Sequence, residues 1–256
     1  MSLKLVSVNI ERSYHLPLVE EFLSHSDADA VCMQELIFED IPRISRALGG
    51  AECIFEPMGI RPDEVPSITM GVGIFSRAPI HDSHARYYVG KKEEPLQEST
   101  NTNPATYNDF KRIVLAVDIE KEGAAYRIAT THFTWTPDGK PNDVQRRDLR
   151  ALLTELEQMG EFVLTGDFNA PRGGEIFDAL ARKYRDNIPH EYTTSLDYAI
   201  HHVPQAKLEA DARAAGVQGH MVDVLFTTPG YSTEGVRLVG GVSDHMAVVA
   251  NIAAQH

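Results

Sequence analysis

The stretch LTGDFNAP, residues 164–171, ends an apolar run with an acid and an amide two residues apart. Successive side chains of a strand point to opposite faces, so we expect Asp167 and Asn169 to point the same way. The same alternation turns Phe168 into the core. Two polar groups that share a direction at the end of a strand form half of a functional site, and other segments must contribute the rest.

The composition is that of a globular protein with an acidic surface. Hydrophobic residues make up 43% of the 256 residues and charged residues 24%, and the formal net charge is −13. Such a charge argues against a protein whose main task is to grip a nucleic-acid backbone, although an enzyme that binds divalent cations can still act on phosphate. The sequence has no apolar run long enough to span a bilayer and no signal-peptide pattern, so we expect a soluble, cytoplasmic protein.

Strand-like and helix-like segments alternate along the chain, which is typical of an α/β fold. Helical periodicity predicts helices over residues 16–25, 41–50 and 175–184, and a further helix from a cap at Asn142 to a stop at Gly160. Strands are predicted at residues 4–10, 29–35, 53–58, 70–77, 110–120, 125–135, 161–169, 221–228, 236–241 and 246–252. Without a repeat or a linker, residues 1–256 are expected to form one domain of packed sheets with helices outside.

Two long stretches lack a clear pattern. Residues 84–110 and 185–219 are polar or irregular in sequence, and we expect loops there. Loops of such length inside a compact domain are usually functional, so these two are expected to influence the choice of substrate. Neither carries the clustered lysines and arginines that a strong binder of duplex DNA needs.

Polar residues that are able to take part in catalysis or metal binding recur where predicted strands meet loops. They are Asn9, Glu35, His132, Asp167 and Asn169 at strand ends, and Asp223, Asp244 and His245 at strand starts. A sheet that gathers such ends builds a crevice lined by carboxylates, amides and imidazoles. Each residue alone is explained as readily by a turn or a cap, but the whole set together indicates an active site.

The ordered set of motifs resembles the endonuclease/exonuclease/phosphatase family, also called the DNase I-like family. The matching stretches are SVNIE (7–11), MQEL (33–36), GVGIFSR (71–77), TTHF (130–133), TGDFNAP (165–171), VDVLFTT (222–228) and GVSDHMAVV (241–249). They follow the family's order and cover nearly the whole chain. The resemblance implies a four-layered α/β sandwich of two mostly antiparallel sheets flanked by helices, and metal-dependent hydrolysis of phosphate esters.

The resemblance also implies a metal site for Mg²⁺ or Mn²⁺. By position in the motifs, Glu35 is expected to be the principal ligand, with Asn9 beside it and Asp244 completing the site. Carboxylates together with water and substrate oxygens are the ligands that Mg²⁺ prefers. The sequence leaves open whether one or two metal ions are used.

The other matched residues have implied catalytic roles. Asp167 would activate or orient the attacking water, and Asn169 would hold that water or a phosphate oxygen. His132 would donate a hydrogen bond to the phosphate. Asp223 and His245 would form a carboxylate–imidazole pair near the transition-state oxygens, in which His245 acts either as general base or as phosphate stabiliser.

Several other residues are weaker candidates. Trp135 lies close to His132 in sequence and is equally well explained as a wall of the cleft or as a buried or rim aromatic residue. Lys111 and Arg112 start a strand near the crevice and are candidates for substrate contact, but solvated charges are favoured. Asp197 competes with Asp223 as the partner of His245, and Asp223 is preferred. Three histidines, His201, His202 and His220, match no zinc spacing and are expected to be structural or exposed.

The sequence therefore predicts a metal-dependent phosphoesterase. A phosphodiesterase is favoured over a monoesterase, and the acidic surface favours a small, lipid-derived or nucleotide-derived substrate over long DNA. The alternatives are an endo- or exonuclease with the same site, and a family member that has lost turnover and serves as a binding module. The substrate and the oligomeric state are not predicted.

Overall fold

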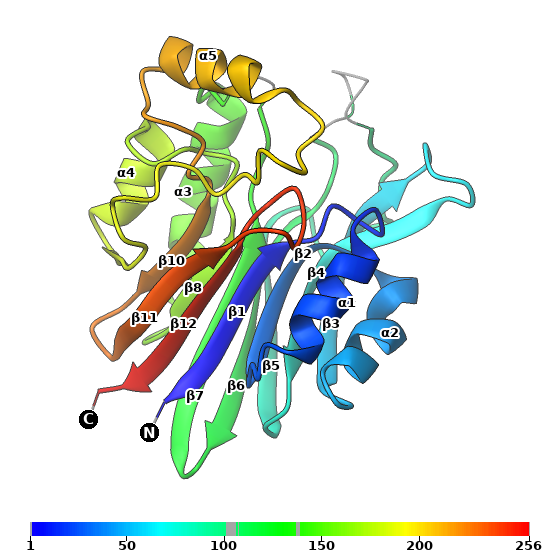
Figure 1. Cartoon of the computed structure of the whole chain (residues 1–256), viewed down its shortest axis with the longest axis vertical. Coiled ribbons are helices and arrows are strands. Elements are labelled where there is room, and N and C mark those ends of the chain that lie inside the picture. Colours follow the sequence, from blue (N-terminus) through cyan, green and yellow to red (C-terminus); the bar gives the residue numbers. More distant parts are fainter. Residues whose placement is uncertain (1, 101–105, 107, 137–138, 256) are drawn as a thin grey trace.

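Two sheets of six strands each lie face to face at the centre of the molecule (Figure 1). The structure is a computed structural model that describes residues 2–100, 106, 108–136 and 139–255. Helices cover the outer faces of both sheets, which gives the four layers of an α/β sandwich. The predicted fold class is therefore confirmed.

The first sheet has the strand order β11-β12-β1-β2-β4-β3. Its strands are β1 (Leu3–Asn9), β2 (Ala30–Ile37), β3 (Glu52–Arg61), β4 (Ile68–Ser76), β11 (Tyr231–Val239) and β12 (Ala247–Ala254). Strands β1 and β2 run parallel, and the other neighbours run antiparallel.

The second sheet has the order β5-β6-β7-β8-β10-β9. Its strands are β5 (Ile80–Val89), β6 (Arg112–Lys121), β7 (Ala124–His132), β8 (Val163–Asp167), β9 (Arg185–Asp186) and β10 (Asp223–Thr227). Strands β7 and β8 run parallel, and the other neighbours run antiparallel. Each sheet thus contains one parallel pair near its middle.

The helices divide between the two outer faces. The first sheet is covered by α1 (Leu16–Ser24), the short 3-10 helix η1 (Phe38–Asp40) and α2 (Ile41–Ala47), and the second by α3 (Asp143–Glu157) and α4 (Glu175–Ala181) (Figure 1). Helix α3 begins at the predicted cap, where the Asn142 side chain accepts a hydrogen bond from the Gln145 N–H at 2.9 Å. No helix in the described part of the chain is long and apolar enough to cross a membrane.

Apolar side chains fill the three spaces between the four layers. Leu5 of β1 and Leu115 of β6 belong to the cluster between the sheets. Val19 belongs to the cluster under α1 and α2, and Leu152 and Phe177 to the cluster under α3 and α4. Burial of these three clusters is the main favourable contribution to folding, and it fixes how the sheets face each other.

The parallel pairs bring strand ends from both sheets to one edge of the sandwich. In the first sheet Asn9 is in register with Gln34, next to Glu35, and in the second His132 is in register with Asp167. Antiparallel β10 begins at the same edge, because Asp223 is in register with Asp167. The predicted polar residues therefore gather at one edge, and α5 (Gln205–Ala215) lies beyond it (Figure 1).

The prediction of a loop over residues 84–110 was wrong for its first six residues, 84–89. Residues 84–89 belong to β5, which lies at the edge of the second sheet and pairs with β6 alone. An edge strand with one exposed face lacks the aliphatic run of a buried strand, so the composition resembled a loop. The pair Tyr87-Tyr88 was the feature of the sequence that indicated a strand here, because aromatic residues favour strands. Residues 101–105 and 107 of the predicted loop lie outside the described residues.

The prediction of an irregular region over residues 185–219 was also partly wrong. It contains the short strand β9 and the helix α5, which Gly216 ends with a φ of +76°. Helix α5 has a weak apolar stripe, with Leu208 and Ala212 as its buried residues. Its signal in the sequence was the helix-favouring composition QAKLEADARAA before a glycine rather than a periodic pattern.

We predict that Gly166→Ala strongly destabilises the fold. Gly166 lies in β8 with a φ of +134°, and a Cβ there would lie 2.0 Å from the Thr131 carbonyl oxygen of the neighbouring strand. A loss of about 3 kcal/mol or more in the free energy of unfolding is expected in urea denaturation.

The matched control is Gly123→Ala in the β6–β7 turn, which has a φ of +79° but nothing within 4 Å of the added Cβ. This variant should lose only about 1 kcal/mol of unfolding free energy, because alanine is disfavoured at a positive φ. Equal losses in the two variants would show that the close approach of β7 and β8 does not require glycine.

Candidate active site

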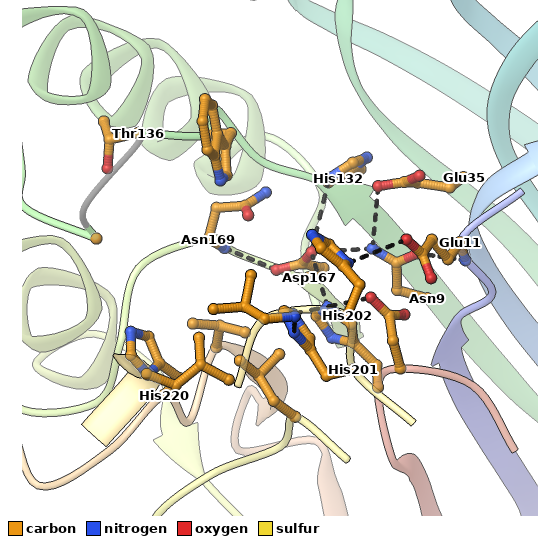
Figure 2. Close-up of a pocket in the computed structure, with 18 of the residues that line it drawn as sticks. Asn9, Glu11, Glu35, His132, Thr136, Asp167, Asn169, His201, His202 and His220 are labelled. Atoms are coloured by element: carbon orange, nitrogen blue, oxygen red, sulfur yellow. Dashed lines mark hydrogen bonds and ion pairs between the residues drawn. The ribbon is translucent and has the colours of Figure 1, made fainter. Parts of the chain in front are cut away.

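A cavity of ≈ 340 Å³ opens at the edge where the strand ends meet. The predicted residues that line it are Asn9, Glu35, His132, Asp167, Asn169, Asp244 and His245. The eighth predicted residue, Asp223, is buried and bonded to His245. Figure 2 shows Asn9, Glu35, His132 and Asp167 pointing toward one another. The structure thus brings together all the residues that the sequence singled out.

The side chain of Asn9 joins the two sheets at this edge. Its Nδ2 donates to Asp167 Oδ2 of the second sheet at 3.0 Å and to Glu35 Oε1 of the first at 3.4 Å. Its Oδ1 accepts from the backbone N–H of Glu11 at 3.0 Å. The amide nitrogen therefore faces both carboxylates, and Asn9 fixes where they lie.

Asp167 and Asn169 both line the cavity, but for a different reason than the predicted alternation along a strand. Strand β8 ends at Asp167, and Asn169 adopts a φ of +48°. The Asn169 N–H donates to Asp167 Oδ1 at 2.8 Å, and its Nδ2 donates to the Phe133 carbonyl at 3.1 Å. A side-chain-closed turn, rather than a continuing strand, thus points both groups to the cavity while Phe168 enters the core.

Left-handed backbone conformations of residues other than glycine concentrate around the cavity. Glu11, Arg12, Glu35 and Asn169 have φ values between 45° and 60°, and all four line it. For Glu35 the cause is a bulge in β2, because the pairing of β2 with β4 shifts register between Met33 and Leu36. Such conformations cost about 1 kcal/mol or more each and are retained where they aim a functional side chain.

Asp223 is the partner of His245. Asp223 Oδ2 lies 2.7 Å from His245 Nδ1, so the N–H of the ring donates to the carboxylate. Asp197, the competing candidate, instead accepts from the backbone N–H groups of Ala199 and Gly241. Burial alone would lower the pKa of His245, but the charge and hydrogen bond of Asp223 and the nearby Asp167 raise it well above its ordinary value.

Carboxylates crowd the cavity. Burial raises the pKa of Glu35, Arg12 opposes this shift, and the charges of Asp244 and Asp167 reinforce it. Burial likewise raises the pKa of Asp167. A divalent cation would relieve this repulsion, and carboxylate oxygens are the ligands that Mg²⁺ and Mn²⁺ accept. The residues present therefore fit a hard divalent cation between Glu35 and Asp244.

His132 lies beside Asp167, and its side chain is buried. Its Nε2 is 3.6 Å from Asp167 Oδ2, and no described residue bonds its buried Nδ1. Burial lowers the pKa of His132 to about 4, although the charge of Asp167 opposes the shift. At neutral pH His132 is therefore a neutral imidazole with one N–H to donate.

Basic residues that the sequence treated as solvated or did not single out are buried, and two of them, Arg12 and Arg112, line the cavity. Arg112 Nη1 donates to the carbonyls of His132 and Phe133, and Lys111 Nζ donates to the carbonyl of Lys92. Arg12 lies between Glu35 at 3.7 Å and Glu64 at 2.8 Å. The prediction of solvated charges was wrong for Lys111 and Arg112, which are buried, because the backbone carbonyl groups that accept from them come from distant parts of the chain.

The segment 195–203 brings further residues to the cavity. Asp197 N–H donates to the Asp244 carbonyl, and Met246 N–H donates to the Ser195 carbonyl, both at 2.7 Å. These bonds hold His201 and His202 beside Asp244, and both histidines line the cavity together with Trp135 and His220. The prediction of structural or exposed histidines fits two of them, because His201 accepts a hydrogen bond from the Val203 N–H and the His202 side chain is 71% exposed.

Comparison of the sequence with protein families gives one informative match. The model of the Endonuclease/Exonuclease/phosphatase family matches residues 6–245. No curated protein matches the sequence.

Solved structures share the fold at low sequence identity. The catalytic domain of human Nocturnin, solved with a bound sulfate anion, is 15% identical with a TM-score of 0.71, over 99% of this chain and 94% of that one. A mannosyl-6-phosphatase from Bacteroides thetaiotaomicron is 13% identical with a TM-score of 0.68, over 98% and 100%. An endonuclease/exonuclease/phosphatase family protein from Leptotrichia buccalis is 14% identical with a TM-score of 0.68, over 98% and 99%.

We predict that His132 lowers the stability of the fold in acid. Its pKa of about 4 lies below the ordinary value of about 6.5 in the unfolded chain. Between these two values the unfolded chain binds a proton that the folded protein does not, so the contribution of His132 to stability falls as the pH falls. The loss should be on the order of 3 kcal/mol by pH 4 and absent above about pH 7.

The test compares urea unfolding of the wild type and His132→Gln at pH 7.5 and pH 4.5. When the pH is lowered from 7.5 to 4.5, the wild type should lose more unfolding free energy than the His132→Gln variant. His81→Gln, at a histidine that is 58% exposed, is the matched control for loss of an imidazole. A difference independent of pH would mean that His132 titrates alike in both states.

Proposed function

The chain belongs to the endonuclease/exonuclease/phosphatase family, and we propose that it is a divalent-metal-dependent phosphoesterase that hydrolyses a small phosphodiester. Members of this family are hydrolases that act on phosphoesters, and they generally use divalent metals. The observation that carries the proposal is the convergence of three carboxylates and two histidines, Glu35, Asp167, Asp244, His132 and His245, on one cavity.

In the proposal Glu35 and Asp244 hold the cation, which is Mg²⁺ or Mn²⁺. When bound, the cation withdraws charge from the phosphate oxygens and so favours attack at phosphorus. Asn9, predicted to lie beside the metal, has its amide nitrogen toward Glu35 and Asp167 and so keeps both carboxylates in place. Arg12 contacts Glu35 from the other side.

Asp167 and Asn169 prepare the attacking water in this proposal. Asp167 is a buried carboxylate whose oxygens already accept from Asn9 and from the Asn169 N–H, which fixes its orientation. It takes up the proton of the water as the oxygen attacks phosphorus in line with the leaving group. Asn169 is held through its Nδ2 at Phe133, so its Oδ1 can accept a hydrogen bond from the same water.

In this proposal the two histidines stabilise the phosphate from beside Asp167, because the Nε2 atoms of His132 and His245 lie 3.6 Å and 3.9 Å from Asp167 Oδ2. His245 has its Nδ1–H on Asp223 and its Nε2 3.9 Å from Asp167 Oδ2, so a proton on Nε2 points into the cavity. This arrangement supports the role of phosphate stabiliser over that of general base, because a doubly protonated ring cannot accept a proton. Neutral His132 donates its one N–H, and both donors are most effective where water is excluded.

The walls of the cavity favour a small substrate. The segment 195–203 and helix α5 contribute Leu196, Val203 and Leu208 to its lining, so the site is covered on that side. The cations that line it among the described residues are already paired: Arg12 with Glu64, Arg112 with carbonyl oxygens, and Lys207 with Asp211. A polynucleotide would find few free cations there, whereas a single phosphodiester requires only the central site.

We predict metal-dependent hydrolysis of bis(p-nitrophenyl) phosphate that exceeds hydrolysis of p-nitrophenyl phosphate. Activity should require Mg²⁺ or Mn²⁺ and vanish in EDTA. Glu35→Gln and His245→Ala should each lower kcat/KM by about 100-fold or more, because each removes a group that stabilises transition-state charge.

Glu120→Gln, at a carboxylate that is 55% exposed, is the matched control and should retain full activity. Metal binding without turnover of either ester would contradict the proposal and favour the binding-module alternative. Equal loss in the Glu120 variant would mean that the losses are not specific to the cavity, and full activity in Glu35→Gln and His245→Ala would point to a contaminating enzyme.

We further predict slow cleavage of long DNA. At an ionic strength of about 0.15 M, kcat/KM for a nicked or supercoiled plasmid should be about 100-fold lower than for the small diester. The cations that line the cavity are already paired, so DNA bound there would release few of its condensed counterions. Plasmid cleavage that outruns the small diester and falls steeply with added salt would establish the nuclease instead.

A further inference from the structure

The active-site cavity continues into a part that takes no part in the proposed catalysis, and we call it the outer pocket. Figure 2 shows Thr136 and His220 on the side of Asn169 that is away from Glu35. Thr136 belongs to the connection between β7 and α3, and His220 to the connection between α5 and β10. Five residues of the cavity lining make up the outer pocket: Trp135, Thr136, Leu208, His220 and Val222.

Two polar atoms of the outer pocket are buried without a partner among the described residues. Thr136 is 3% exposed, and no described residue bonds its Oγ1. The same holds for the buried Nδ1 of His220. Buried polar atoms are almost always hydrogen-bonded, because leaving them unpaired costs free energy. A hydroxyl and an imidazole nitrogen that line one cavity are therefore suited to a ligand that supplies donors and acceptors.

The other surfaces of the outer pocket are apolar. Leu208 of α5 and Val222 belong to one small buried cluster. Trp135 is half-buried and is the only tryptophan of the chain. An indole ring stacks well on a second aromatic ring, and aliphatic side chains pack against its apolar face. A pocket with apolar walls and a few polar atoms is typical of a site for a small organic group.

The described residues at the outer pocket carry no unpaired charge. Lys207, next to Leu208 in sequence, donates to Asp211 Oδ2 at 2.6 Å. Burial lowers the pKa of His220, although the charge of Asp211 opposes the shift, so the ring is neutral at neutral pH. A second phosphate or a carboxylate would lose its hydration here without gaining an opposite charge. The group that the outer pocket accepts is therefore uncharged.

Two kinds of uncharged group fit the outer pocket poorly. A sugar or polyol carries a hydroxyl on nearly every carbon, and hydroxyls buried against Leu208 and Val222 would lack partners. An acyl chain would leave Thr136 Oγ1 and His220 Nδ1 unpaired. A nucleobase has two apolar faces and a polar edge with donors and acceptors, so it matches both the walls and the two polar atoms.

We propose that the outer pocket binds the heteroaromatic base of a nucleoside, with one face of the base on Trp135 and its polar edge at Thr136 and His220. The whole cavity has a volume of ≈ 340 Å³, at the lower end of the range for ligand pockets, which suits one base beside one phosphate. That the substrate is a small diester of a nucleoside phosphate rests on the proposed function, whereas binding of the base does not.

The test uses the tryptophan fluorescence of the full chain, because a chain with one tryptophan reports on Trp135 alone. The protein is titrated with adenosine in EDTA, so that no ester is hydrolysed. The wild type is expected to show saturable quenching by adenosine and none by ribose or 1-octanoyl glycerol. Absence of quenching by adenosine would overturn the proposal. Equal quenching by ribose or by 1-octanoyl glycerol would overturn it in favour of a sugar or an acyl group.

Two variants each remove one polar atom of the outer pocket. Thr136→Val deletes the hydroxyl at nearly the same volume, and His220→Phe keeps a ring but removes the nitrogen. Each should raise the dissociation constant for adenosine by about 10-fold, because a hydrogen bond at a buried site is lost. His220 is only partly buried, so its variant covers the case in which Thr136→Val does not fold.

The matched control is Thr154→Val, at an exposed hydroxyl of α3, which should leave the dissociation constant for adenosine unchanged. An equal rise in this control would overturn the proposal, because the effect would not be local to the outer pocket. An unchanged constant in the folded Thr136→Val or His220→Phe variant would overturn it as well.

Hydrolysis separates this inference from the proposed function. With Mn²⁺, kcat/KM for adenosine 5′-(p-nitrophenyl phosphate) should exceed that for methyl p-nitrophenyl phosphate by about 100-fold, and Thr136→Val should lower this ratio by about 10-fold. A merely structural defect would lower both values alike. Adenosine binding without hydrolysis of either ester would refute the proposed function and leave the outer pocket standing. Hydrolysis of both esters without adenosine binding would do the reverse.

Discussion

The hydrogen bonds of the Asn9 side chain, to Asp167 of the opposite sheet and to Glu35 of its own, are the contacts on which the site depends. A second polar contact crosses between the sheets nearby, where Gln34 Nε2 donates to Thr130 Oγ1 at 2.8 Å. Hydrophobic burial brings the sheets together but has no preferred direction. The buried amides supply the direction, because a donor left unpaired at that depth would cost about 1–3 kcal/mol.

The same edge carries costs that the rest of the fold must offset. Glu35 and Asp167 are carboxylates with raised pKa values in one buried cavity, and Glu11, Arg12, Glu35 and Asn169 have left-handed backbones. Neither the buried carboxylates nor the left-handed backbone conformations favour folding. Both place charged or polar side chains in the same cavity. A cation would neutralise this charge, so we expect that metal binding and folding stability are linked in this protein.

The cover of the site is built from the part of the chain that departs most from the family motifs. Segment 195–203 is tied to the strand of Asp244 and His245 through a bridge between Leu196 and His245. Two backbone hydrogen bonds, from Asp197 N–H to the Asp244 carbonyl and from Met246 N–H to the Ser195 carbonyl, hold it there. A segment attached in this way holds His201 near Asp244 and places Leu196 in the lining of the cavity.

The sequence alone was sufficient for the α/β class, for most helices and strands, and for eight polar residues of the site, although it missed Arg12, which also lines the cavity. These features follow from local patterns: the apolar period of each element, the cap at Asn142, and the polar residues where strands end. It failed at β5 and α5, where edge position and exposure remove the periodic pattern on which such predictions depend.

Other features were decided only by tertiary structure. The burial of Arg112 depends on the carbonyl groups of β7, about twenty residues away, and the turn that aims Asn169 is stabilised by Phe133. The closeness of Glu11 to Asp244 depends on the antiparallel pairing of β1 with β12, and the position of His201 beside Asp244 depends on segment 195–203 lying against the residues that precede β12. Local sequence patterns determine which side chains lie at the end of each strand. The distances between strand ends depend on how the two sheets pack, and no local pattern encodes that packing.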